Sequence, residues 1–100
     1  MKRWMGGWLA VSLAGCTTGP QPIPAASPEM AARSGIPLKT LQQGNAVYLS
    51  QCGRCHELIP PDEVKTDDWH LVMPGMCWNA GLSRADESLV LKYVLAAKQP

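Results

Sequence analysis

The chain has 100 residues, with 9 basic against 8 acidic side chains and a formal net charge of +1. This length allows one domain at most. The balanced charge lacks the basic excess typical of nucleic-acid-binding domains, so we expect no nucleic-acid partner.

The N-terminus has the layout of a bacterial export signal. Lys2 and Arg3 supply positive charge, and residues 4–13 form a mostly apolar run that is too short to span a bilayer. The run ends in Leu-Ala-Gly-Cys at 13–16, which resembles the lipoprotein box of bacterial lipoproteins. That resemblance implies a signal peptide over 1–15 and a lipid on Cys16. An uncut anchor or an ordinary export signal are the alternatives.

The resemblance also implies a location. A lipid on Cys16 anchors the protein to a bacterial membrane from the periplasm. The outer membrane is favoured because the residue after Cys16 is not Asp.

A Pro-rich segment follows the lipoprotein box. Residues 16–37 contain five prolines among small and polar residues, without a periodic apolar pattern. Such a segment buries too little apolar surface to offset its ordering entropy, and Pro-rich linkers extend at about 3.1 Å per residue. We therefore expect an extended tether over 16–37, with at most a brief helical turn at Met30–Arg33, and a folded domain over 38–100.

The domain itself has helical signals only. Apolar residues recur at spacings of three and four over about 41–52, and an acidic turn begins a second stretch over about 67–73. Pro74-Gly75 should end or kink that stretch, and Ser83 is a suitable N-cap for a third helix. No alternating strand pattern occurs, so the expected fold is all-α.

The sequence Cys52-Gly53-Arg54-Cys55-His56 is the motif that indicates a chemical function. Two thiols three positions apart, followed directly by an imidazole, form the pattern of c-type haem attachment. The thiols bond to the haem vinyl groups, and the imidazole binds the iron. We expect one covalent haem c held by Cys52 and Cys55, with His56 as an iron ligand.

The paired cysteines fit a disulfide, a zinc site or a chance occurrence less well. A redox-active disulfide normally accompanies a βαβ pattern, which is absent. A zinc site would have to recruit His70 and Cys77, whose spacing matches no familiar module. A chance occurrence of the motif is disfavoured by the export signal, because c-type haem is attached outside the bacterial cytoplasm.

From about residue 41 to the end, the chain resembles the class I cytochromes c, in particular a short single-haem subgroup. Gly44, Tyr48 and Cys52 follow the spacing of that family's first helix. The resemblance implies a small three-helix cytochrome c fold around one covalent haem. It also implies that Gly44 lets the first helix cross closely against the last, at Tyr93. Only a missing side chain allows such an approach.

The same resemblance assigns roles around the haem. A carbonyl at Pro60 or Pro61 would accept the second N–H of His56 and fix the ring orientation. Trp69 and Trp78 would cover the haem, and an indole N–H could bond a propionate.

Four side chains are candidates for the sixth iron ligand. Met76 is the first choice, because Trp69, Met76 and the following Gly-Leu-Ser match the subgroup pattern. Met73 is the second choice, because Met73-Pro74 resembles the ligand loop of other members. His70 and Cys77 remain. We expect Cys77 to be buried against the haem, because free Cys behaves as a small apolar residue.

These features predict an electron carrier, a membrane-tethered cytochrome that exchanges electrons with periplasmic or membrane redox proteins. The alternative is a haem-based gas sensor or ligand-binding protein with an open sixth position. No nucleophile–base arrangement or pair of carboxylates suggests an enzyme.

Overall fold

The structure is a computed structural model that describes residues 23–54 and 57–98. The predictions for the signal peptide, for Cys16, for Cys55 and for His56 lie outside the described residues. The predictions for Cys52, for Met76 and for the helices lie within them.

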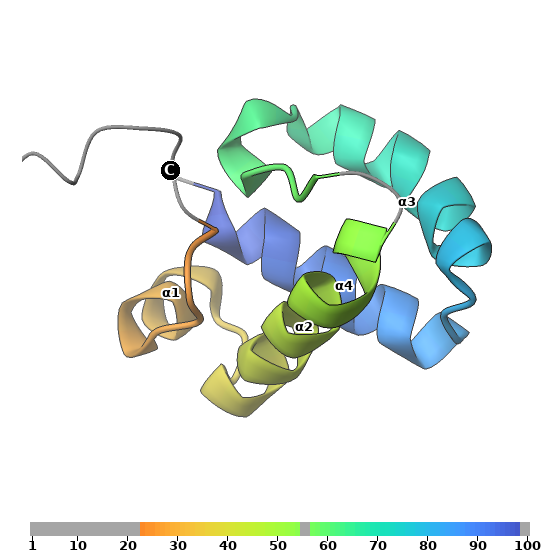
Figure 1. Ribbon diagram of the computed structural model, residues 1–100. Coiled ribbons are helices and arrows are strands. Elements are labelled where there is room, and N and C mark those ends of the chain that lie inside the picture. Colours follow the sequence, from red (N-terminus) through yellow and green to blue (C-terminus); the bar gives the residue numbers. More distant parts are fainter. Residues whose placement is uncertain (1–22, 55–56, 99–100) are drawn as a thin grey trace, which may run out of the picture.

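The described chain is built from helices, and no strand occurs in it (Figure 1). This agrees with the predicted all-α class. None of the helices in this part of the chain is both long and apolar enough to cross a membrane. The elements in order are α1 (Pro28–Ser34), α2 (Leu38–Gln51), η2 (Cys52–Arg54), η3 (Pro61–Glu63), α3 (Thr66–Ala80) and α4 (Arg84–Ala97).

The crossing of α2 and α4 is the most extensive helix contact in the fold. A Cβ atom placed on Gly44 would lie 2.2 Å from the Leu89 carbonyl oxygen and 2.7 Å from Tyr93 Cβ. One turn later, the rings of Tyr48 and Tyr93 pack with centroids 5.7 Å apart. The predicted approach of Gly44 to the last helix at Tyr93 is therefore confirmed.

The predicted start of the last helix is also confirmed. Ser83 is the N-cap of α4, and its hydroxyl accepts a hydrogen bond from the Asp86 N–H at 3.1 Å. The inner face of α4 is fully buried at Val90, Tyr93 and Val94.

The middle helix is longer than predicted. Pro74 does not end it, because α3 continues to Ala80 with Pro74 inside. Its ribbon changes direction in the second half, which agrees with the other predicted outcome, a kink (Figure 1). An interior proline costs about 3 kcal/mol, but Met73 and Cys77 on either side of it are each 1% exposed. Their burial offsets the cost, and Gly81, at φ 74°, then ends the helix.

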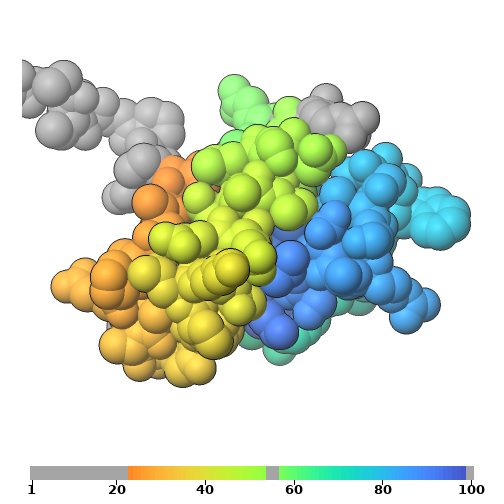
Figure 2. Space-filling model, turned by 90° about the horizontal axis from the view of Figure 1, so that it is seen from below, coloured from red at the N-terminus to blue at the C-terminus, as the bar shows by residue number. Residues whose placement is uncertain are grey.

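The prediction of an extended tether over 16–37 is wrong for residues 23–37. Ser27 caps α1, and Met30 is only 4% exposed. The Pro24 carbonyl accepts hydrogen bonds from the Tyr93 hydroxyl and from Asn45 Nδ2, the latter at 3.3 Å. Figure 2 shows the segment lying directly against α2. The segment has too few apolar residues for a core of its own, but α2 and α4 provide an apolar surface on which it packs.

The Gly44 contact predicts the effect of adding one methyl group. We expect Gly44→Ala to lower the free energy of unfolding by about 1–3 kcal/mol or more, because a helix backbone cannot move aside as a side chain can. Chemical denaturation would measure it. Gly75→Ala is the matched control, since nothing lies within 4 Å of a Cβ there. A control that loses as much stability as Gly44→Ala would show that the helix crossing is not the cause.

Because the N-terminal segment packs on the domain, truncating its buried side chain at Met30 should lower stability, whereas the same change in a free tether would not. We expect Met30→Ala to lower the free energy of unfolding by about 2–4 kcal/mol, because it leaves a cavity against the core. The neighbouring exposed Ala32, changed to Ser, should have an effect within about 0.5 kcal/mol. Equal stabilities of the two variants would show that α1 does not pack on the domain.

Candidate functional site

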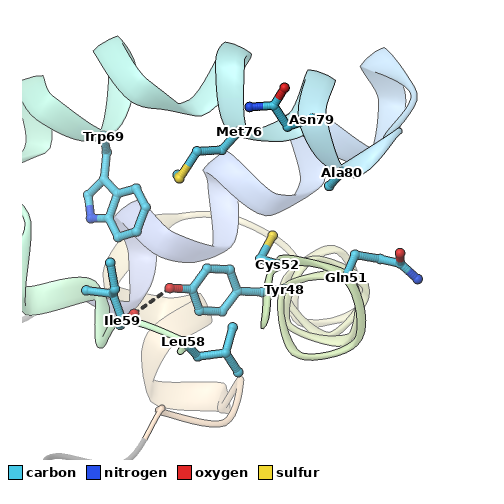
Figure 3. Close-up of a pocket in the computed structure, with 9 residues that line it drawn as sticks. All are labelled: Tyr48, Gln51, Cys52, Leu58, Ile59, Trp69, Met76, Asn79 and Ala80. Carbon is cyan, nitrogen blue, oxygen red and sulfur yellow. Dashed lines mark hydrogen bonds between the residues drawn. The ribbon is translucent and has the colours of Figure 1, made fainter. Parts of the chain in front are cut away.

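The site is an apolar pocket between the end of α2 and the inner face of α3 (Figure 3). Its volume is about 110 Å³. Trp69 and Met76 contribute to one wall because they are seven residues apart, about two helical turns, on one face of α3. The pocket is lined by Tyr48, Gln51, Cys52, Leu58, Ile59, Trp69, Met76, Asn79 and Ala80.

The two aromatic walls are held by hydrogen bonds to backbone carbonyls. The Tyr48 hydroxyl donates to the Ile59 carbonyl, and Trp69 Nε1 donates to the Pro61 carbonyl at 3.0 Å. The two rings meet edge to face, with centroids 6.4 Å apart. Burial raises the pKa of Tyr48 to about 12, so its hydroxyl stays neutral and remains a donor. Both rings therefore present hydrocarbon to the pocket.

The structure separates the four candidates for the sixth ligand. Met76 is half-buried and lines the pocket, with its sulfur directed into it (Figure 3). Met73 is 1% exposed and belongs to the core, outside the lining of the pocket. His70 is exposed. The fourth candidate, Cys77, is 1% exposed, so its burial is confirmed, but it lies in the core and does not line the pocket.

Cys52 faces Met76 across the pocket. It is half-buried directly after α2, with its sulfur on the side of α3 (Figure 3), and burial raises the pKa of its thiol. The other members of the attachment sequence, Cys55 and His56, lie outside the described residues. Within 23–54 and 57–98 no three His, Cys, Asp or Glu side chains gather as a metal cluster.

The carbonyls predicted to accept from His56 have partners within the chain. The Pro60 carbonyl accepts the Glu63 N–H at 2.9 Å. The Pro61 carbonyl accepts from Trp69 and, at 3.5 Å, from Lys98 Nζ. The bond from His56 stays a prediction. The bond from an indole N–H to a propionate also stays a prediction, and the Trp69 N–H already donates to the Pro61 carbonyl.

The prediction that Trp78 covers the haem is not supported by its position. Its side chain is 85% exposed and does not line the pocket. Trp78 follows Trp69 by nine residues, about two and a half turns, so a continuous helix directs the two indoles to opposite sides.

Two amide side chains at the pocket were not predicted. Asn79 lies three residues after Met76, one turn along α3, and Gln51 comes just before Cys52. The helical period identifies Asn79 once α3 is known to pass through Pro74. Nothing in the sequence marks Gln51, or the loop residues Leu58 and Ile59, as part of a site.

The chemistry of the pocket fits a haem, although its volume is smaller than that group. Apolar walls with one thiol and one thioether suit a large apolar ring and a soft metal centre. Ligand pockets of drug size usually measure about 300–1,000 Å³. Binding of a whole porphyrin therefore requires the walls around Cys52 and Met76 to move apart.

Comparison with known proteins gives no relative. No protein-family model matches the chain, and no curated protein or solved structure is detectably similar to it. The site must therefore be interpreted from its own residues.

The buried Cys77 thiol predicts a loss of stability at alkaline pH. Burial raises its pKa from 9.0 to about 11, so the folded state holds this proton more tightly than the unfolded state does. The resulting stabilisation is complete below pH 9 and is lost as the pH rises from about 9 through 11. We expect denaturation curves across this range to fall more steeply for the unchanged chain than for Cys77→Ala. Parallel curves would contradict the prediction, because the tyrosines titrate in both proteins.

Proposed function

We propose that this protein is an exported, lipid-anchored c-type cytochrome that carries one electron at a time between redox proteins. The proposal depends on one observation above the others. Cys52, the first residue of the attachment sequence, opens onto an apolar pocket whose opposite wall presents the thioether of Met76. A thiol for covalent attachment and a thioether for the sixth position, in an apolar surrounding, are what a haem c with His and Met ligands requires.

Each residue has a definite task in this proposal. Cys52 and Cys55 hold the haem covalently, His56 is one iron ligand, and Met76 is the other. A haem held in this way supplies one-electron exchange between ferric and ferrous iron.

The chain's own contribution is an apolar surrounding with two hydrogen-bonded aromatic rings. The Tyr48 hydroxyl and the Trp69 indole N–H are both bonded to backbone carbonyls, so neither ring is free to reorient. Apolar side chains at Leu58 and Ile59 close the loop side of the pocket. Apolar walls leave little water that must reorient when the charge on the iron changes, which keeps the reorganisation small and favours rapid electron transfer.

The position of Met76 favours a carrier over the gas sensor. A sensor needs an open sixth position, whereas a half-buried thioether directed into the pocket would fill it. Neighbouring Met73 is packed in the core, so it is the less suitable ligand.

The proposal predicts how two methionine variants differ. In the full chain made with haem-attachment machinery, we expect Met76→Ala to lose the weak long-wavelength absorption of Met-ligated ferric haem. It should also bind CO rapidly in the ferrous form. Met73→Ala should keep that absorption but lose about 2–5 kcal/mol of stability, because its side chain is buried.

Two results would overturn the proposal. A protein that stays colourless in a host that attaches haem to other cytochromes would exclude the cofactor. A high-spin absorption spectrum that is the same with and without Met76 would exclude that residue as ligand and would support the open-site sensor.

A further inference from the structure

The loop that precedes α3 is held by side chains from three different parts of the chain. We call residues 58–64 the carbonyl loop, because its backbone carbonyls accept hydrogen bonds from donors outside it. The donors belong to α2, to α3 and to the residue that directly follows α4. The pairs, with the donor first, are Tyr48 with Ile59, Trp69 with Pro61, and Lys98 with Val64.

The carbonyl loop determines where two walls of the pocket stand. Leu58 and Ile59 line the pocket directly. Tyr48 and Trp69 line it as well, and the polar atom of each ring is bonded to a carbonyl of the loop (Figure 3 shows the bond from Tyr48). A displacement of the loop would therefore remove the acceptors that fix both rings.

Lys98 is the one of these three donors that does not line the pocket. Its ammonium donates to the Val64 carbonyl and, at 3.5 Å, to the Pro61 carbonyl. The Pro61 carbonyl is also the acceptor of Trp69 Nε1, at 3.0 Å. The ammonium and the indole nitrogen are therefore neighbours on one oxygen atom.

The backbone from which the Lys98 side chain extends is itself held in place. Helix α4 ends one residue earlier, at Ala97, which is buried. Arg33 of α1 donates to the Ala96 carbonyl at 2.9 Å. Lysines are mostly exposed, and ordering their long side chains costs entropy. The half-buried Lys98, with its ammonium on two carbonyls, has by contrast a definite position.

We propose that Lys98 is a positioning residue for the pocket. By donating to the Pro61 and Val64 carbonyls, it holds the carbonyl loop against the end of α4 and keeps Trp69 in the pocket wall. A second consequence rests on the proposed function. A positive charge beside the pocket disfavours ferric iron, the more positive of the two oxidation states, and so raises the reduction potential of a haem bound there.

Hydrogen exchange tests the positioning role without reference to the cofactor. The experiment uses the full chain in detergent, as it is produced in a host that attaches haem, under reducing conditions. We expect Lys98→Met, which keeps an apolar stem but removes the donors, to speed exchange of the Trp69 indole N–H at least about tenfold, because the loop opens more often. NMR would measure the rate, Trp69→Phe would identify the signal, and circular dichroism would verify folding.

Two further variants separate the position of the charge from its loss. Lys92→Met is the matched control, because it removes the same charge from an exposed site on α4. It should leave the exchange rate unchanged. Lys98→Arg keeps a charged donor at the loop and should retain slow exchange.

The midpoint potential of the haem-loaded protein is a readout that a merely structural role would not move. We expect Lys98→Met to lower the potential in a redox titration followed by absorption. Lys98→Arg should keep the potential of the unchanged chain, and so should Lys92→Met, because solvent and salt screen an exposed charge.

Three outcomes decide between the possibilities. Exchange of the Trp69 N–H that is equally slow in Lys98→Met and Lys92→Met would overturn the positioning role. Equal potentials in those two variants would overturn the electrostatic consequence. A colourless protein in which only Lys98→Met speeds the exchange would refute the proposed function and leave the positioning role standing.

Discussion

The absent side chain at Gly44 is the constraint on which the rest of this fold depends. It allows the backbone of α2 to lie against the Leu89 carbonyl of α4, an approach that any Cβ would prevent. Tyr48, one turn later, packs on Tyr93, and one turn beyond that stands Cys52, at the pocket. The position of the thiol is thus tied to the helix crossing two turns before it.

The segment before α2 reinforces that same crossing. The Pro24 carbonyl accepts hydrogen bonds from Asn45, which follows Gly44 directly, and from Tyr93, which Gly44 contacts. One carbonyl therefore joins α2 to α4 beside the Gly44 crossing. Arg33 adds a second link by donating to the Ala96 carbonyl at 2.9 Å. A small domain has little core to spare, and this segment supplies Met30 as an additional part of it.

Local signals in the sequence were enough for the cap at Ser83 and the burial of Cys77, which follow from capping chemistry and side-chain polarity. The crossing at Gly44 was predicted from the resemblance to the class I cytochromes c, together with the need for a missing side chain at a close helix contact. The packing of Met30 and the passage of α3 through Pro74 depend instead on surfaces contributed by distant residues. From the sequence alone, a proline is expected to end a helix, because the tertiary contacts that can outweigh its destabilising effect are not visible there.

The continuation of α3 through Pro74 determines the chemistry of the site. A helix that ended at Met73 would leave Met76 and Trp78 without a fixed orientation toward Trp69. A continuous helix sets the phase of all three, so that Met76 joins Trp69 at the pocket while Trp78 points to solvent. The interior proline costs stability, but the helix that contains it fixes the direction of these side chains. The Met76 thioether faces the pocket on one side of α3, and the Trp78 indole faces solvent on the other.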